Sequence, residues 1–356
     1  SFPATVEPID TLRAVIKGGV AGTRDYRPSL FTRISWFSEK TGGDGVDAAL
    51  DYAKGKIDKA QFAERAGAGE SAALVCDFAS DCLKFFVAKD RISLAEYRSR
   101  ILSLLSMRST LPAMADYGRS VTVPAEPESS HRSNKLALGW GRGSNDFISL
   151  SYRPTCTDII DSDIGLPKNS GIVFGNAELR YYPGPRKLEL ESFDIAKITA
   201  VPPVTRFFIP KSFIFEAGVH QRAVPDKETV LAGYVNGGLG VSFSFCRFAH
   251  FYAMAKSENN FSDSYAHKSM LAVGGQCGLI SDFYDVWKSV VTCAALSVPW
   301  GDTTRIVRVS AEERVRLSSM TQITGSYSRE YCFKRTEDFF RIQGEILFLT
   351  VFENPC

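Results

Sequence analysis

The chain has 356 residues, enough for one large or two ordinary domains. Hydrophobic residues make up 44% and charged residues 23%, the balance of a folded protein rather than a disordered one. The formal net charge is only +2, so no global field recruits nucleic acid, and we expect no nucleic-acid partner.

The sequence contains no apolar run of the roughly 18 residues that a membrane-spanning helix needs. That leaves open a barrel, which crosses with short alternating strands. The chain begins SFPATVEP, without Met and without a signal peptide. We therefore expect a mature or cleaved product, or the ordered part of a longer chain.

The eight cysteines are scattered without a CxxC pair, which argues against a zinc site. We expect no metal and no cofactor. The even count permits disulfides in an oxidising compartment. Cys76 and Cys82 could pair across a turn, but not within one straight helix, and free thiols remain an alternative.

Residues 1–122 are predicted to form a helical domain. The stretch IDTLRAVIKGG places Leu12, Val15 and Ile16 at helical spacing and ends at a glycine pair. Two longer stretches, ESAALVCDFASDCLKFFVAKD and SLAEYRSRILSLLSMRSTL, each gather their apolar residues on one face and predict a helical hairpin. Residues 123–134 are rich in Pro, Ser and Glu and indicate a linker.

From residue 135 to the C terminus the period of the pattern changes to two. Turn signals such as GRGSN, PGPRK and FKRTED separate the candidate strands. There are about twelve: 135–142, 146–154, 171–183, 187–201, 211–223, 229–245, 248–258, 268–282, 286–299, 304–318, 321–333 and 338–353. Long strands in chain order with mostly short connections indicate an up-and-down meander, and closure removes its exposed edges. Residues 135–356 are therefore predicted to form an antiparallel β-barrel.

The two faces of these strands decide between water and lipid. One face is almost free of charge, whereas Arg or Lys facing lipid near the midplane costs about 2–4 kcal/mol. The other face carries nearly balanced charges that would fill a narrow lumen, so we predict a transmembrane barrel. The predicted lumen network is Glu178, Arg180, Glu189, Glu216, His220, Arg308, Arg314, Arg316, Arg341 and Glu345, with Glu191, Arg222 and Glu312 on the same face.

The opening part of strand 171–183 shows the pattern most simply. Val173, Gly175, Ala177, Leu179 and Tyr181 are expected on one face, opposite Phe174, Asn176, Glu178 and Arg180. Aromatic residues near strand ends are candidates for interfacial girdles: Trp140, Tyr181, Tyr182, Phe207, Phe208 and Trp287. Two exceptions to the alternation predict a strand end beyond the bilayer, at Glu313, and a bulge, at Ser192.

Several motifs are candidates for catalytic or ligand-binding sites. His250 could belong to a Ser–His hydrolase on the barrel wall, but the sequence identifies no Ser or orienting Asn or Asp. The acidic stretch RPTCTDIIDSD could bind calcium, although turn and capping chemistry is favoured. The glycines of VNGGLGV indicate a bulge, kink or close packing rather than a phosphate loop. The stripe RIVRVSAEERVRL predicts a salt-bridge ladder with Glu312 and neighbouring Glu side chains. No catalytic residue is assigned.

Residues 149–245, including RPTCTDIIDSDIGLPKNSGIVFGNAELRYYPGPRKLELESFDI and VNGGLGVSFSF, resemble the C-terminal half of the Lnb-type proteins of Gram-negative bacteria. The stretches EPIDTLRAV and RDYRPSLFTRI resemble the same family. The sequence departs from the family pattern at Cys156 and at Lys211–Ser212. The resemblance implies an outer-membrane β-barrel. It also implies an N-terminal cysteine-peptidase-like domain, associated in some members with lipoprotein N-acylation, which we expect to precede this chain.

The function expected from these observations is that of an outer-membrane anchor or scaffold for a periplasmic module or complex. The expected location is the outer membrane of a Gram-negative bacterium, with the helical domain in the periplasm. The expected partners are outer-membrane lipid and periplasmic or outer-membrane proteins, and no enzyme activity is expected for the chain as given. Alternatives are the non-catalytic C-terminal part of a lipoprotein- or envelope-modifying enzyme, a small-solute channel and a soluble β-domain with a binding pocket.

Overall fold

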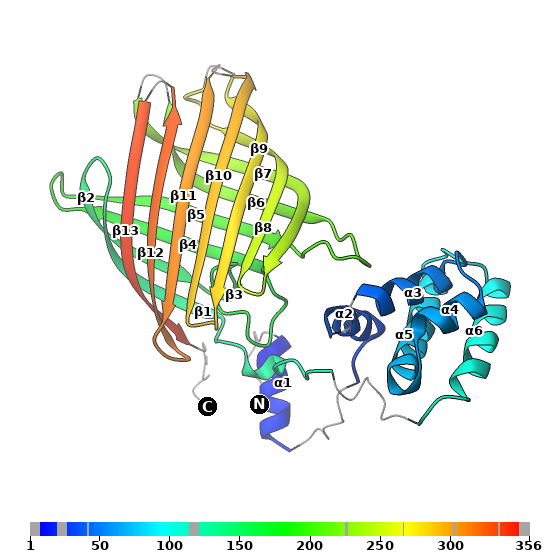
Figure 1. Ribbon diagram of the computed structural model, residues 1–356. Helices are drawn as coiled ribbons and strands as arrows, with labels where there is room; N and C mark the ends of the chain where they lie inside the picture. The colour runs from blue at the N-terminus through cyan, green and yellow to red at the C-terminus, as the bar shows by residue number, and fades with distance from the viewer. Residues whose placement is uncertain are drawn as a thin grey trace. The chain divides into compact units, whose positions relative to one another are not determined.

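The computed structural model describes residues 8–19, 27–40, 43–113, 121–224, 227–265, 267–301, 304–333 and 335–348. It divides the chain into two compact units, one of residues 22–124 and one of residues 1–21 with 125–356 (Figure 1). Helix α1 (Pro8–Lys17) belongs to the strand-containing unit, whereas the sequence interpretation placed it in a helical domain 1–122. A long-range hydrogen bond attaches α1 to this unit: Arg13 Nη2 donates to the Ser130 carbonyl at 2.7 Å.

The helical unit contains α2 (Leu30–Lys40), α3 (Gly43–Ala53), α4 (Lys59–Ala66), α5 (Gly69–Ala88) and α6 (Leu94–Arg108). Capping boxes start α4 at Asp58 and α6 at Ser93, where the side chains bind the orphan amide groups of the first turn. Phe37 and Phe78 stack in the core with 4.0 Å between ring centroids. No helix among the described residues is long and apolar enough to cross a membrane.

Cys76 and Cys82 both lie on α5, are buried and are free thiols. Because both cysteines lie in one helix, they do not pair with each other. Burial, assisted by the charge of Asp77, raises the pKa of Cys76 to about 11, which makes it an unreactive thiol.

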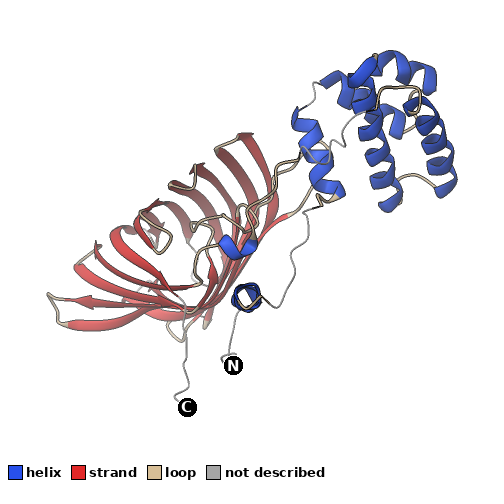
Figure 2. Cartoon of the chain, turned by 90° about the horizontal axis from the view of Figure 1, so that it is seen from below, coloured by secondary structure: helices blue, strands red, loops and turns tan. Residues whose placement is uncertain are grey.

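The other unit contains thirteen strands that form one curved wall (Figures 1 and 2). They are β1 (Asn134–Arg142), β2 (Asp146–Arg153), β3 (Thr155–Thr157), β4 (Ser170–Tyr182), β5 (Lys187–Ala200), β6 (Ser212–Val224), β7 (Lys227–Cys246), β8 (Ala249–Phe261), β9 (Ser269–Phe283), β10 (Trp287–Trp300), β11 (Arg305–Arg316), β12 (Thr321–Cys332) and β13 (Arg335–Phe348). All pairings are antiparallel. β2 and the short β3 both pair with β4, so they occupy one place in the wall. Pairing of β1 with β13 and of β2 with β4 closes the sheet. The predicted closed, up-and-down barrel of twelve strands is confirmed.

The outer surface of the wall is apolar along most of the strands, as the alternation predicted. Leu138 on β1 is 63% exposed, and residues of the same phase on other strands are also exposed. They include Ile148, Leu150, Phe215, Leu231, Val241, Val273, Leu279, Val291, Val307, Val309, Ile323, Ile342 and Ile346. A belt of this kind suits lipid and not water, because a soluble monomer rarely exposes so large an apolar surface. The chain is a membrane β-barrel.

Two of the expected girdle residues do not face outward. Trp140, Tyr181 and Trp287 are exposed on the outer surface, but Phe207 is buried and Tyr182 packs its ring 5.8 Å from that of Phe147. Tyr181 and Tyr182 are consecutive in a strand, so they cannot share one face.

The alternation in β4 is not continuous. Val173 is 2% exposed and faces inward, whereas Phe174 is 44% exposed, so the predicted common face of Val173 and Leu179 is wrong. The phase changes at Gly175, which has φ of +70°. The irregularity expected near Ser192 is confirmed, because Glu178 pairs with Ser192 and Leu179 with Leu190, which leaves Glu191 as the extra residue of a bulge.

Glu313 lies on the outer surface near the end of β11. It accepts a hydrogen bond of 3.3 Å from the indole nitrogen of Trp287. An amphipathic ring bound to a carboxylate is typical of the membrane–water interface.

The two ends of the barrel differ. We call the end where β1 begins and β13 ends the terminal end, and the opposite one the far end. The far-end connections are all short: 143–145, 183–186, 225–226, 262–268, 301–304 and 333–334. The terminal end carries the two long connections, residues 154–169 and 201–211. We call residues 158–169 the plug segment, for reasons given below.

Candidate functional site: the filled lumen

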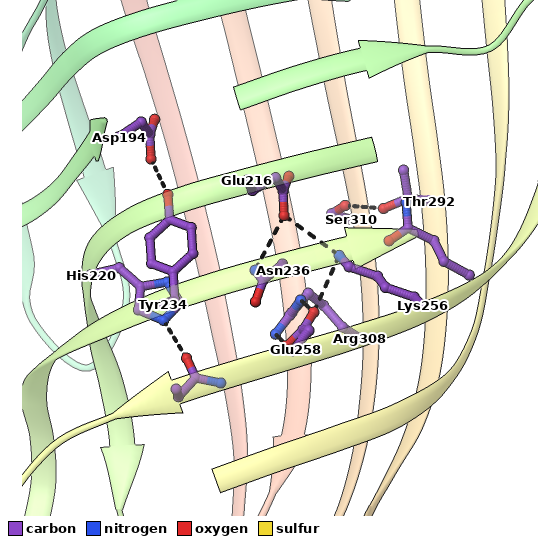
Figure 3. A network of polar contacts seen from close by, with 12 residues as sticks. Asp194, Glu216, His220, Tyr234, Asn236, Lys256, Glu258, Thr292, Arg308 and Ser310 are labelled. Atoms are coloured by element: carbon purple, nitrogen blue, oxygen red, sulfur yellow. Dashed lines mark hydrogen bonds and ion pairs between the residues drawn. The ribbon is translucent and has the colours of Figure 1, made fainter. Parts of the chain in front are cut away.

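The middle of the lumen is crossed by a network of ion pairs (Figure 3). At its centre is Glu258 of β8, whose side chain is 2% exposed. Its carboxylate lies 3.2 Å from Lys256 Nζ, 2.9 Å from Arg308 Nη1 and 3.6 Å from Arg222 Nη2. Ion pairs therefore connect three strands here, β6, β8 and β11.

Glu330 of β12 completes this network. It lies 2.6 Å from Arg308 Nε and 2.9 Å from Arg222 Nη1, while Glu216 lies 3.8 Å from Lys256. Three carboxylates thus face three cations. The balance matters because a buried charge without a partner is far more costly than a buried pair.

Neutral polar groups continue the network toward one side. His220 Nε2 lies 3.0 Å from the side-chain oxygen of Asn260, and its ring lies 4.6 Å from that of Tyr234 (Figure 3). The Tyr234 hydroxyl donates to Asp194. A second charged group lies on another part of the wall, where Glu178 of β4 binds both Arg180 of β4 and Arg341 of β13.

Aromatic rings hold this second group. The Arg180 guanidinium lies 4.5 Å from the ring centroid of Phe147 and 4.3 Å from that of Phe339, and it also pairs with Glu191 at 3.1 Å. Glu189 stands apart from the predicted network, since it pairs with the exposed Lys187.

An apolar cluster lines part of the far end of the lumen. Its members face inward from six strands and one connection: Val224, Ala232, Tyr265, Met270, Ala272, Leu296, Val298, Ile306 and Cys332. On these six strands the inward side chains nearest the far end are therefore apolar.

The plug segment fills the terminal end. Ile159 and Ile160 pack against inward-facing residues of the wall, among them Ile214, Tyr252 and Ile280. Charged contacts lie beside them, because Asp161 Oδ2 is 2.6 Å from Arg153 Nη2. The loop is therefore held by both apolar and ionic contacts.

Lysine and arginine side chains of the wall bind the rest of this segment. Lys288, which is 0% exposed, donates to the Asp161 carbonyl at 3.0 Å and lies 2.9 Å from Asp163. Ser162 donates to Asp285 at 2.8 Å, and Asp285 in turn binds Arg314 and Arg316 at 3.2 and 3.1 Å. The predicted ladder along β11 thus exists, but its partners are Glu258, Glu330 and Asp285 rather than Glu312.

The carboxylates of the acidic stretch pair with cations of the wall. Lys197, Arg153 and Lys288 neutralise Asp158, Asp161 and Asp163. Asp161 also accepts from the Asp158 amide at 2.8 Å, the expected turn chemistry. In the described part of the chain, no group of three or more His, Cys, Asp or Glu side chains could hold a metal ion.

The ionisation of Asp161 depends on these cations. Burial alone would raise its pKa, but Arg153 and Lys135 outweigh burial and hold the pKa well below its ordinary value of 3.8. Asp161 therefore stays ionised through neutral and mildly acidic pH. The last predicted residue of the network, Glu345, shares this corner, 3.3 Å from Lys135.

His250 has the serine that the hydrolase hypothesis required. Its Nδ1 lies 3.1 Å from Ser244 Oγ, and its Nε2 donates to the Val201 carbonyl at 2.6 Å. A carbonyl orients the ring but carries no charge to balance an imidazolium. These contacts tie the connection 201–211 to the wall, which is a structural role.

Sequence reasoning missed several members of the lumen networks. Lys256 and Glu258 share the inward phase of β8 with His250, so a count of every second residue from His250 would have found them. Of the glycines of β7, Gly240 serves close packing, since a Cβ there would lie 2.0 Å from the Ala253 carbonyl oxygen, whereas a Cβ at Gly237 would meet no atom within 4 Å.

Solved structures with a similar fold are porins and channels. "KdgM porin in complex with disordered oligogalacturonate" is 6% identical, with a TM-score of 0.34, and the match covers 60% of this chain and 99% of that one. A NanC porin is 8% identical, with a TM-score of 0.36, over 61% of this chain and 100% of that one. The outer membrane channel DcaP of Acinetobacter baumannii is 6% identical, with a TM-score of 0.30, over 64% and 100%. No curated protein matches the chain.

Two family models match the sequence, and they divide it as the structure does. DUF7842, a domain of unknown function, matches residues 24–118, which are the helical unit. DUF7840, also a domain of unknown function, matches residues 124–345, which include β1 through most of β13. Because the second match covers more than half of the chain, this protein belongs to the DUF7840 family.

Proposed function

We propose that the chain is an outer-membrane anchor, a filled barrel that holds the helical unit in the periplasm of a Gram-negative bacterium. The observation that carries this proposal is the lumen. Arg314 and Lys288 are 0% exposed and Glu258 is 2% exposed, although all three face the inside of the barrel. Side chains that line an aqueous pore are exposed to its water, so this interior suits a support rather than a conduit.

The order of the units supports an anchor as well. Residues 22–124 are inserted between α1 and β1, both of which belong to the barrel unit. The helical unit is therefore attached to the barrel unit through the chain at each of its ends. The connections at the terminal end are also longer than those at the far end. This difference is expected if the terminal end faces the periplasm and supports the helical unit.

Two measurements test this function. In planar bilayers, we expect the purified chain to show no conductance steps, and reproducible steps would favour the small-solute channel instead. For anchoring, protease sites are placed within residues 22–26 and 114–120. Cleavage at both sites should release the helical unit from isolated membranes. Retention after double cleavage would show that the unit binds the membrane by itself and would contradict the anchor role.

The resemblance of residues 149–245 to Lnb-type proteins favours a more specific cargo. On that basis we infer that the barrel supports an envelope-modifying domain with Cys/His chemistry, which acts on lipoproteins. The reading frame upstream of the codon for Ser1 tests this inference. A Cys/His domain encoded there supports it, and its absence there removes the basis for this cargo but leaves the anchor role untouched.

A further inference from the structure

A cavity of about 670 Å³ lies at the terminal end of the barrel unit, beside α1. Its volume falls within the range of about 300–1,000 Å³ that is usual for small-molecule sites. One side is formed by α1, another by residues 129–132, and the rest by the plug segment and the ends of β11, β12 and β13. It adjoins the filled lumen, since Ser162 of the plug segment and the inward-facing Gln322 line it, but α1 and residues 129–132 are not part of the strands.

The charged side chains that line the cavity are all basic. Arg13, Lys17, Arg132 and Arg316 line it, and none of the described residues around it is acidic. Arg13 is held by Ser130, and Arg316 by Asp285. Lys17 and Arg132 form no ion pair with any residue that the structure describes. A concave surface with four cations and no carboxylate attracts an anion, and arginine in particular recognises phosphate or carboxylate oxygens.

The same cavity has an apolar part. Ile16 of α1, Ile164 of the plug segment, Met320 and Leu347 line it together with the cations. Ile16 remains 37% exposed although α1 is docked. Apolar side chains beside a cluster of cations suit a ligand that has an acidic head and a hydrocarbon tail. A free inorganic anion would contact the cations and leave the apolar side chains without a partner.

A hydrogen-bonding group in the lining lacks a partner. His131 Nδ1 lies 2.7 Å from the Arg132 carbonyl and donates to it. Its Nε2 is buried and has no hydrogen-bond partner within the described residues. In this tautomer Nε2 is an acceptor, so it can receive a hydroxyl of a ligand that enters the cavity.

We propose that this cavity binds an anionic amphiphile, namely a lipid with a phosphate head group, through Lys17 and Arg132 at the head and Ile16 and Ile164 at the tail. The cavity lies at the terminal end of the barrel, beside the ends of β11, β12 and β13, and the head group of a membrane lipid is expected near the ends of membrane-spanning strands. Binding there would join α1, residues 129–132 and the plug segment through one ligand. The inference does not rest on the anchor role, and either one can fail without the other.

The test uses the full chain in a neutral detergent, titrated with dioctanoyl phosphatidic acid and followed by native mass spectrometry. We expect one lipid per chain, with a dissociation constant about tenfold or more below those of inorganic phosphate and dioctanoylglycerol. Equal binding of inorganic phosphate would reduce the site to a bare anion site and overturn the amphiphile. Equal binding of dioctanoylglycerol would overturn the ionic recognition.

Variants locate the site. The double substitution Lys17→Gln and Arg132→Gln should weaken phosphatidic acid binding about tenfold or more, and Ile16→Glu should weaken it as well. The matched control, Lys168→Gln with Lys211→Gln, removes two basic residues that lie near the same end but do not line the cavity. If the control pair weakens binding as much, or if the cavity pair has no effect, the site is not here. Heat-modifiable migration of each variant verifies that the barrel is folded.

Discussion

Arg308 of β11 binds Glu258 of β8 across the lumen, with 2.9 Å between Nη1 and Oε1, and the two residues are 50 positions apart in the sequence. Neither residue is a strand neighbour of the other, because β9 and β10 lie between β8 and β11. The contact therefore spans the interior and does not follow the wall. It makes the lumen a second set of tertiary interactions, in addition to the hydrogen bonds between strands.

The first prediction concerns this contact. Glu258→Gln leaves Arg222, Arg308 and Lys256 with one carboxylate fewer in a buried site, and we expect a loss of about 3–5 kcal/mol in the free energy of unfolding. Urea unfolding in lipid vesicles measures it. The control is Glu189→Gln, whose exposed partner Lys187 makes the pair worth about 0–1 kcal/mol. Equal effects of the two substitutions would show that the lumen network does not contribute to stability as a unit.

The second prediction concerns the plug segment and pH. The pKa of Asp161 is depressed in the folded state, so its stabilisation is complete above the unfolded value of 3.8 and is lost only as the pH falls through the lower folded value. Between pH 7 and pH 4 we expect amide hydrogen exchange of residues 158–169 to stay slow after correction for the intrinsic rate. Asp161→Asn should speed exchange there at every pH in this range, because Arg153 loses its partner. A plug that opens between pH 7 and pH 5 in the unmodified chain would contradict the structure.

The third prediction tests the contact with lipid. Val309 lies near the middle of β11 and faces outward, so Val309→Arg should destabilise the barrel in vesicles by about 2–4 kcal/mol. Val315→Arg, on the same face near the end of the strand, should cost about 0–1 kcal/mol. A similar small effect at both positions would mean that water, and not acyl chains, surrounds the wall.

The fourth prediction concerns the independence of the helical unit. Phe78→Ala removes the ring that stacks on Phe37 and should destabilise that unit by about 3–5 kcal/mol. Circular dichroism at 222 nm should show an earlier helical transition, while heat-modifiable migration of the barrel stays unchanged. A change in barrel migration would show that the two units fold together.

The sequence predicted the wall of the barrel because a strand of period two separates lipid-facing from lumen-facing residues in a single chain. The prediction weakened where the contrast between faces is small. On β8 the outward residues Ala253, Ala255 and Ser257 are barely apolar, so Lys256 and Glu258 did not stand out. On β4 the phase change at Gly175 reversed one half of the expected pattern.

The plug could not be predicted for a different reason. Its position depends on contacts such as Lys288 with Asp161, which are 127 residues apart, and no local periodicity records them. The same is true of α1, which joins the barrel unit through Arg13 and Ser130, 117 residues apart. Local patterns gave the strands, whereas the filling of the interior depends on long-range charge pairing.

The short far-end connections limit how much of the protein is exposed at the cell surface in the proposed orientation. In the proposed orientation, no stretch longer than residues 262–268 reaches the outer medium. Phages and antibodies would have little exposed chain to bind on an intact bacterium, and proteases would have little to cleave. A protein built this way would escape surface recognition and the sequence diversification that such recognition drives.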